Sequence, residues 1–551
     1  MIRLILLCLS FIGAAAFPCA GFTTFRVAVD PTIKLEPGAG RLVIFLIPDD
    51  SPVDGKTKPI DGPFTDHDFP IFALDVPRMT VGAPVTLNET AAFFPTPMSK
   101  LAPGGYRAQA LFDMHHQDSK WRREAGNAYS KEVHFVVPSP ESKDAIRDTP
   151  VDLVLSQVTR EPARAAAPGL DWFSTPSKLL SEFRKEEVTL RAGVVFPTNY
   201  DPKGRYAAIY FVPGFGGDDR DAPRMAASLA RGAESGPSQE LARSTFLIVL
   251  NAEGPNGHNL FADSANNGPC AQALIGELIP ALEAKYPLIA RPEARLLRGH
   301  SSGGWSTLWL ALQYPKTFGA TWSSSPDPVD FRAFQTINIY EDKNFYVAPD
   351  GSERPSTRSL DRTTGESKVN CSVRRESRQE DILSPDNTSA QQWDSWAAVA
   401  GPRNAAGHPA ALFDPETGQI DHSIAEQYRK YDIGLLVRSD PDRYLPILQK
   451  NVRLICGGAD NFYLNLAVQL FLKDVSVLSH TPVRTVDKAD SMPVPGQKPE
   501  DRIEYVLEYP GEPGYIKLLP GYDHGTIFGS PQSRAIPQEM VDHLKKNGLA
   551  K

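Results

Sequence analysis

The chain has 551 residues, more than one ordinary domain usually contains, so we expect two or three domains. Hydrophobic residues make up 41% and charged residues 23%, which excludes wholesale disorder. The 49 prolines argue against an all-helical bundle, because each interior proline removes a helix hydrogen bond. A formal charge of -8 gives no electrostatic reason to bind nucleic acid.

The N-terminus is typical of a secretory signal peptide. Arg3 precedes a mostly apolar run over residues 4–12, and small residues follow at 13–16. The run is too short for a comfortable transmembrane span, and no later run is long enough. We therefore expect residues 1–20 to be a signal peptide. The mature protein is then secreted or periplasmic, without stable membrane insertion.

The five cysteines include no CxxC pair, so they indicate neither a zinc knuckle nor a disulfide scaffold. A single bridge between Cys270 and Cys371 stays open as an alternative. HExxH and EF-hand patterns are both absent from the sequence. We expect no metal and no cofactor.

Residues 22–138 predict an N-terminal β-module, most simply a small β-sandwich. Strand-like segments are separated by turn signals and lie at 24–29, 41–47, 106–112 and 131–137. Residues 139–184 are expected to be a connecting segment, because they open with a polar stretch.

From about residue 185 the pattern changes to short apolar strands that alternate with helices, which predicts a doubly wound, mainly parallel α/β domain over 185–551. The strands are expected at 188–196, 207–212, 246–250, 295–298, 320–322, 452–456 and 515–519. The helices are expected at 221–231, 269–286, 302–312 and 537–546, the third directly after the fourth strand and the last opened by a proline. Residues 331–450 interrupt this rhythm and are expected to form an inserted cap.

The strongest motif is Gly299-His300-Ser301-Ser302-Gly303, which matches G-x-S-x-G. It follows a predicted strand and opens a predicted helix, the context that a nucleophile elbow requires. Small residues must flank the serine because the turn is tight. Ser301 is therefore the candidate nucleophile.

A nucleophilic serine needs a base and a carboxylate that orients the base. His524 lies just past the last apolar strand, where the chain order Ser…Asp…His requires a histidine. Asp460 follows the strand at 452–456 and is the preferred acid. Asp327 and Asp330 follow the strand at 320–322 and stay open as alternatives, Asp327 before Asp330.

An oxyanion hole needs two backbone N–H groups. Ser302, directly after the nucleophile, is expected to supply one and Phe215 the other. Phe215 lies in the loop after the strand at 207–212, where Gly214 and Gly216 allow the backbone to approach the substrate. His300 is expected to contact the substrate as well.

A polar segment at 257–268 follows the strand at 246–250 on the same predicted sheet edge. One interpretation makes Asn266 and Asn267 part of a polar wall for a hydroxylated substrate. The alternative is that Asn267 caps the following helix.

Together the segments 212–217, 299–303, 457–460 and 520–525 resemble the "Putative esterase" family of α/β-hydrolases, a group similar to esterase D, enterochelin esterases, feruloyl esterases and mycolyltransferases. The resemblance covers about 185–545, apart from much of 331–450. It implies a serine esterase without a cofactor, acting on a small-molecule or carbohydrate-linked ester. Many members have His-Gly where this chain has Pro213-Gly214. An acyltransferase with the same triad, or a non-catalytic binding protein, remains an alternative.

Overall fold

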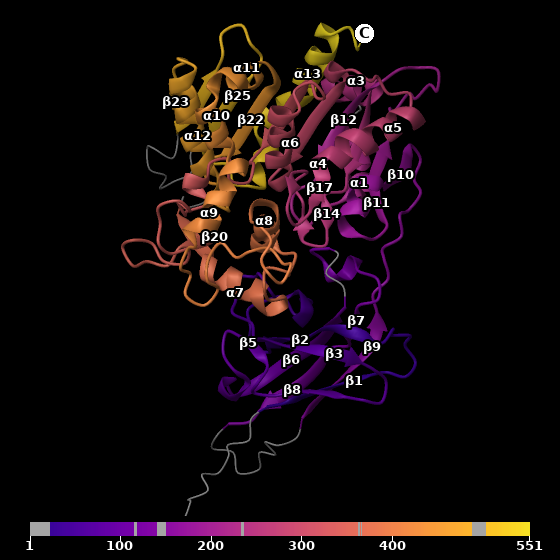
Figure 1. Cartoon of the computed structure of the whole chain (residues 1–551), viewed down its shortest axis with the longest axis vertical. Coiled ribbons are helices and arrows are strands. Elements are labelled where there is room, and N and C mark those ends of the chain that lie inside the picture. The colour runs from indigo at the N-terminus through magenta and orange to yellow at the C-terminus, as the bar shows by residue number, and fades with distance from the viewer. Residues whose placement is uncertain are drawn as a thin grey trace, which may run out of the picture.

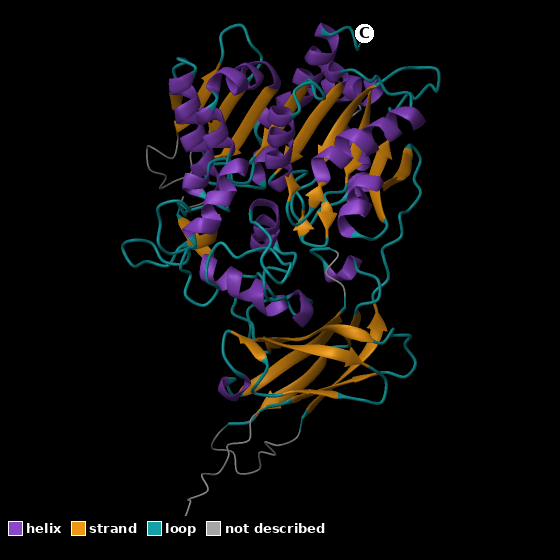
Figure 2. Cartoon of the chain, viewed as in Figure 1, coloured by secondary structure: helices purple, strands orange, loops and turns teal. Residues whose placement is uncertain are grey.

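The computed structural model describes residues 23–114, 118–139, 150–232, 236–361, 364, 366–487 and 503–550. The expected signal peptide at 1–20 lies outside these residues. Two large sheets stand apart along the molecule, an N-terminal one without large helices and a larger one packed among helices (Figures 1 and 2). Within the described ranges no helix is long and apolar enough to cross a membrane.

The N-terminal sheet has nine strands in the order β4-β1-β9-β7-β6-β2-β3-β5, with β8 also paired to β6. Its strands are β1 (Phe25–Val29), β2 (Gly38–Pro48), β3 (Ile71–Met79), β4 (Val85–Leu87), β5 (Ala92–Phe94), β6 (Gly104–Asp113), β7 (Ala128–Ser130), β8 (Val133–Val137) and β9 (Val151–Val158). Phe25 of β1 lies 6.1 Å from Phe72 of β3 and 5.5 Å from Phe135 of β8 between ring centroids. Strands far apart in the sheet order thus face each other across a shared core.

The segment 139–184 is more structured than expected. Its strand β9 pairs in parallel with β1 and antiparallel with β7, so it belongs to the N-terminal sheet. Leu153 and Leu155 are buried there while Val154 between them is exposed, an alternation that marks a half-buried strand. Farther on, β10 (Leu170–Ser177) and α1 (Lys178–Arg184) join the second sheet. The connection between the sheets is therefore the stretch 159–169.

The second sheet has ten strands in the order β10-β11-β13-β12-β18-β19-β22-β25-β24-β23. The strands after β10 are β11 (Val188–Val195), β12 (Ala207–Val212), β13 (Thr245–Leu250), β18 (Arg295–His300), β19 (Ala320–Ser324), β22 (Val452–Gly457), β23 (Arg484–Asp487), β24 (Ile503–Glu508) and β25 (Tyr515–Leu519). Strands from β13 to β25 in this order run parallel, and the pairs at both edges are antiparallel. The expected mixed α/β architecture is confirmed. The sequence analysis missed β10 and the edge strands β23 and β24.

Helices pack on both sides of this sheet (Figure 2). They include α2 (Ala222–Gly232), α3 (Gly236–Ser244), α4 (Cys270–Ala273), α5 (Ile279–Lys285), α6 (Ser302–Gln313), α12 (Leu464–Leu478) and α13 (Pro531–Lys546). A π-helical turn at Leu274–Leu278 joins α4 to α5, and Pro280 sits in the first turn of α5. The last helix begins earlier than expected, because Ser530 caps it by accepting a hydrogen bond from Ser533 N. Pro537 therefore lies inside α13 rather than opening it.

Between β19 and β22 the chain leaves the sheet and returns over about 120 residues, the expected insertion at 331–450. It forms β20 (Pro355–Leu360), β21 (Ser367–Ser372), α7 (Val373–Leu383), α8 (Gln392–Ala400), α9 (His422–Tyr428), α10 (Ile433–Ser439) and α11 (Pro441–Asn451). Helix α7 packs against β3 and β5, so this part of the segment lies between the two sheets, whereas α10 and α11 lie beside the second sheet (Figure 1).

The described cysteines, Cys270, Cys371 and Cys456, are buried and free. A Cys270–Cys371 bridge is therefore not formed in this structure. Burial is the main cause that raises the pKa of all three thiols, that of Cys270 to about 12. These cysteines behave as small core residues.

Candidate active site

Ser301 occupies a strained turn between β18 and α6. Its backbone has φ 60° and ψ -129°, a conformation that costs a non-glycine residue about 1–3 kcal/mol. The flanking glycines are required by space. A Cβ on Gly299 would lie 2.1 Å from Gly303 O, and one on Gly303 would lie 2.0 Å from Val212 O. The G-x-S-x-G spacing thus builds a turn that presents the serine at the carboxyl end of the sheet.

His524 and Asp460 form a hydrogen-bonded pair in the loops after β25 and β22. His524 Nδ1 lies 2.8 Å from Asp460 Oδ2, and Asp460 is completely buried. The main chain fixes both partners, because Phe462 N donates to Asp460 Oδ1 at 2.9 Å and His524 N donates to Asn461 Oδ1 at 3.0 Å. A proton on Nδ1 leaves Nε2 free to accept one.

The charges around His524 decide its protonation. Burial by itself lowers the pKa of the imidazole, but Asp460 and, more weakly, Asp327 and Asp523 outweigh burial and raise the pKa above its ordinary value. A protonated His524 is therefore stabilised by the Asp460 carboxylate.

Asp327 lies on the serine side of the site. Ser301 Oγ donates to Asp327 Oδ1 in a long contact of 3.4 Å, and Ser302 Oγ donates to Oδ2 at 2.8 Å. Two side chains of α8 also donate to Oδ2, Gln392 Nε2 at 3.1 Å and Trp396 Nε1 at 3.2 Å. Of the two candidate acids, Asp460 therefore bonds to the histidine and Asp327 to the serine.

The third candidate acid, Asp330, is engaged elsewhere. It is fully buried and pairs with Arg332 at 2.6 Å and with Arg438 at 2.5 Å. These contacts make it part of the ionic packing of α10, away from the histidine.

The loop after β12 lies against the elbow. A Cβ on Gly214 would lie 3.1 Å from His300 O and 3.2 Å from Ser301 Cβ, so only glycine allows this approach. Gly216 has φ +72° and donates its N–H to Glu253 Oε1 at 3.2 Å. In the described part of the chain Phe215 N–H makes no hydrogen bond. Ser302 opens α6, where the first N–H groups have no partner within the helix.

Sequence reasoning missed His258, which supports this loop. Its Nε2 lies 3.0 Å from Pro213 O, and Leu260 N donates to its Nδ1 at 3.2 Å. Nε2 therefore carries the proton and donates to the carbonyl. Burial lowers the pKa of His258 to about 4, so the ring is neutral at pH 7. Its place in the polar segment 257–268 was visible in the sequence, but its partner lies 45 residues away.

The structure does not bring Asn266 and Asn267 to the site, and this corrects both interpretations of the polar segment. Asn266 Nδ2 donates to Ala398 O at 3.2 Å and to Gly401 O at 3.0 Å, so it holds the end of α8. Asn267 Oδ1 accepts from Asn256 at 2.9 Å. The carboxylate that caps α4 is Asp263, which accepts from Ala271 N at 2.8 Å.

A cavity of about 410 Å³ opens over the serine. Its lining comes from the sheet edge, from the insertion and from Phe64 of the N-terminal region. The sheet-edge residues are Gly214, Phe215, His300, Ser301, Asp327, Pro328, Phe462, Leu464 and His524. The expected substrate contact His300 lies in this lining, with its ring 4.3 Å from that of His524. Ser301, His524 and the residues Gly214 and Phe215 of the loop after β12 thus share one cavity.

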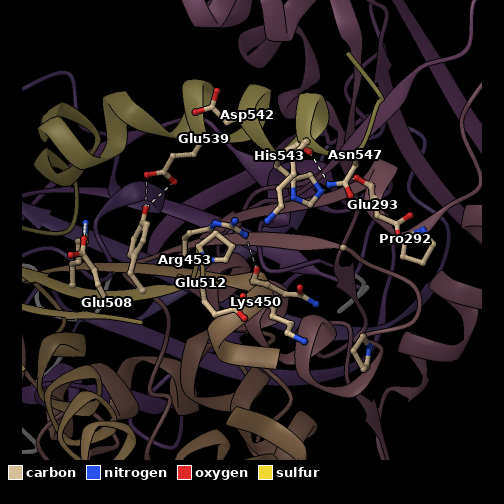
Figure 3. Close-up of a pocket in the computed structure, with 17 residues that line it drawn as sticks. Pro292, Glu293, Lys450, Arg453, Glu508, Glu512, Glu539, Asp542, His543 and Asn547 are labelled. Atoms are coloured by element: carbon tan, nitrogen blue, oxygen red, sulfur yellow. Dashed lines mark hydrogen bonds and ion pairs between the residues drawn. The ribbon is translucent and has the colours of Figure 1, made fainter. Parts of the chain in front are cut away.

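A second cavity of about 680 Å³ lies at the amino ends of the parallel strands, opposite the end that carries Ser301 (Figure 3). Its polar groups are largely paired, since Glu539 accepts from Tyr515 Oη at 3.0 Å and His543 Nε2 lies 2.9 Å from Glu293 O. Open α/β sheets bind ligands at the carboxyl ends of their strands, so the smaller cavity is the candidate active site.

One family model matches part of the chain. Residues 186–408 match it, and the match supports a carboxylic ester hydrolase. The family is the one described as "Putative esterase", which confirms the resemblance seen in the sequence. No curated protein matches the chain.

Solved structures similar to the chain include three hydrolases. A ferulic acid esterase is 13% identical, with 68% of this chain and 98% of that chain covered and a TM-score of 0.36. FphF, a fluorophosphonate-binding serine hydrolase of Staphylococcus aureus, is 14% identical, with 68% and 98% covered and a TM-score of 0.33. An S-formylglutathione hydrolase from Agrobacterium tumefaciens is 14% identical, with 70% and 96% covered and a TM-score of 0.34.

Proposed function

We propose that the protein is an exported serine esterase with an α/β-hydrolase domain, and that Ser301, His524 and Asp460 are its catalytic triad. One observation carries the proposal. The bond of 2.8 Å between His524 Nδ1 and Asp460 Oδ2 orients a base in the same cavity as a serine with strained backbone.

The reaction begins when the Ser301 hydroxyl turns from Asp327 toward His524 Nε2. As Ser301 Oγ bonds to the ester carbonyl carbon, its proton passes to Nε2, and Asp460 stabilises the imidazolium. The N–H groups of Phe215 and Ser302 bind the oxyanion. When the C–O bond to the alcohol breaks, Nε2 returns the proton to the leaving oxygen. Water then attacks the acyl-enzyme in the same way and releases the acid.

We further propose that the N-terminal β-module is a sandwich domain and that the insertion at 331–450 is a cap. The core shared by Phe25 and Phe72 supports the first assignment. The second is supported by α8, whose Gln392 and Trp396 reach Asp327 beside the serine. Export would follow from cleavage of residues 1–20, which N-terminal sequencing of the mature protein tests.

Replacing Ser301 with alanine tests the proposed nucleophile. We expect the loss of hydrolysis of p-nitrophenyl acetate by about 10⁴-fold or more, together with the loss of labelling by a fluorophosphonate probe. Ser306→Ala is the matched control, because Ser306 is a buried serine one turn along the same helix. Full turnover by Ser301→Ala with an unchanged thermal transition would refute the assignment.

A further inference from the structure

The wall of the active-site cavity that the insertion supplies is acidic and has no cation among its described residues. Its Glu376 and Glu380 line the cavity together with Asp327 of the sheet edge, and no lysine or arginine is among the described residues that do. None of these three carboxyl groups forms an ion pair within the described ranges. The nearby guanidinium groups have other partners, since Arg354 pairs with Asp342 at 2.8 Å and Arg375 with Asp68 at 2.6 Å.

Two of these carboxyl groups are occupied by the protein itself. Glu380 accepts from Trp393 N at 3.1 Å and from Asp394 N at 3.0 Å, so it caps the N-terminus of α8. Asp327 receives hydrogen bonds at both of its oxygens. The carboxyl group that can still accept a hydrogen bond from a ligand is therefore that of Glu376.

Only one of the two carboxyl oxygens of Glu376 accepts hydrogen bonds from the described part of the protein. Its Oε2 accepts from Ser356 Oγ and from Trp393 Nε1, the latter at 3.1 Å. Its Oε1 accepts no hydrogen bond from the described residues. These bonds fix the carboxyl group in place, in a residue that lines the cavity, and leave Oε1 unpaired. Burial raises the pKa of this carboxyl group, which reflects the cost of its charge when no cation is present.

A second unpaired acceptor belongs to the same wall. Gln335 lines the cavity, is only 7% exposed, and its Oε1 is buried without a hydrogen-bond partner among the described residues, so a ligand in the cavity contacts this oxygen once the side chain turns. Its neighbour Thr336 contacts Pro355 O at 3.5 Å, and the residue after Pro355 is the Ser356 that holds Glu376. A buried amide oxygen without a partner is rare in proteins and indicates that a donor is brought by a ligand.

Aromatic rings line the same region. The Phe334 ring lies 5.9 Å from that of Trp393 and 5.4 Å from that of Trp396, and all three residues line the cavity. Aromatic faces attract cations and give little to anions. A ligand for this wall must therefore supply hydrogen-bond donors, offset negative charge and tolerate aromatic surfaces.

We propose that Glu376 and Gln335 bind a primary ammonium group of the substrate, so that the enzyme prefers esters that carry this group a few bonds from the carbonyl. The proposal rests on the proposed esterase function and adds its substrate class. An ammonium group supplies three N–H donors and one positive charge, which match the open oxygens of the carboxyl and amide groups.

Isosteric esters test this preference on the full-length enzyme. p-Nitrophenyl 6-aminohexanoate differs from p-nitrophenyl heptanoate by an ammonium group in place of a methyl group. 4-Aminobutyl acetate and pentyl acetate make the same comparison on the alcohol side. We expect the wild type to favour the ammonium ester by about tenfold or more in kcat/KM in at least one pair.

The variants locate the effect. Glu376→Gln should bring that ratio close to one while turnover of the neutral ester stays within about threefold, and Gln335→Leu should lower the ratio in part. Glu353→Gln is the matched control, because Glu353 pairs with Arg374 at 2.8 Å on the exposed surface and should keep the full preference. An unaltered ratio in Glu376→Gln would overturn the proposal.

Other outcomes separate this proposal from the esterase assignment. Turnover of neutral esters without a preference for ammonium, or with a stronger preference for p-nitrophenyl 6-hydroxyhexanoate, overturns the ammonium site and leaves the esterase. Calorimetry with hexylammonium chloride on Ser301→Ala measures binding of the ammonium group to this site in the absence of turnover. Binding that disappears in Ser301→Ala/Glu376→Gln supports it, and absence of binding to Ser301→Ala counts against it.

Discussion

The two walls of the active-site cavity are built differently. The sheet-edge wall consists of short loops that follow parallel strands, and its His524–Asp460 pair is held by main-chain hydrogen bonds. The wall from the insertion consists of α7, α8 and the segment before β20, and Oε1 of Glu376 and Oε1 of Gln335 accept no hydrogen bond from the described residues. Under our proposals the sheet fixes the reaction chemistry, and the inserted segment sets the substrate choice. Such a division allows one fold to serve many substrates.

The largest expected loss of kcat that tests this comparison comes from changing Asp460 and Asp327, the two aspartates beside the proposed base and nucleophile. Asp460→Asn should lower kcat by about 10³- to 10⁴-fold, because the amide cannot stabilise the imidazolium and favours the wrong tautomer. Asp327→Asn is the matched variant and should lower kcat by about tenfold, because Asp327 accepts hydrogen bonds from the serines and from α8 but not from His524. Steady-state kinetics with p-nitrophenyl acetate measures both. A larger loss in Asp327→Asn than in Asp460→Asn would reverse the assignment of the triad acid.

The pH profile gives a second measure of the sheet-edge wall. His524 must be neutral to act as a base, so kcat/KM should fall as the pH drops through its pKa. Burial lowers that pKa, but Asp460, Asp327 and Asp523 outweigh burial and hold it above the ordinary value. Removing the main negative charge should therefore move the acid limb of the residual activity of Asp460→Asn to lower pH. An acid limb at the same pH in wild type and variant would show that Asp460 does not set it.

The N-terminal sheet also contacts the sheet-edge wall, at the oxyanion loop. Arg123 Nη1 donates to Gly216 O at 3.0 Å and to Asp218 Oδ2 at 3.1 Å, and its side chain is only 11% exposed. Arg123→Ala should destabilise the fold by about 3–5 kcal/mol and lower kcat by about tenfold at an unchanged KM. Arg122→Ala is the control, since Arg122 is half-exposed and pairs with Asp61. If kcat of folded Arg123→Ala equals that of the control, the contact is structural only.

Much of the sheet-edge wall could be predicted from the sequence because it depends on local signals. Ser301 follows from a five-residue motif, and His524 from its place after the last parallel strand. The choice between Asp460 and Asp327 could not be made in the same way, since both aspartates follow neighbouring strands, β22 and β19. Only the loop geometry brings one of them to the histidine.

The inserted wall could not be predicted, because its contacts join residues far apart in sequence. Asn266 was expected to face the substrate, yet it binds Ala398 across 132 positions. Strand β9 was missed for a related reason. Its alternation was present in the sequence, but its partner β1 lies at the other end of the N-terminal sheet's segment. Pairing at long range leaves little trace in a local pattern.

The smallest expected effect concerns His258, the buried histidine that holds the oxyanion loop. His258→Phe removes the donor to Pro213 O and leaves a buried carbonyl unpaired, which costs about 1–3 kcal/mol. We expect kcat for p-nitrophenyl acetate to fall by about tenfold with little change in KM, because the proposed role of Phe215 N–H is to bind the oxyanion of the transition state. His543→Phe is the matched control, since His543 also bonds a backbone carbonyl, Glu293 O, but at the far end of the strands. Both variants should lose similar stability in thermal unfolding, and only His258→Phe should lose kcat. Equal kcat values for the two variants would mean that the loop keeps its alignment without His258.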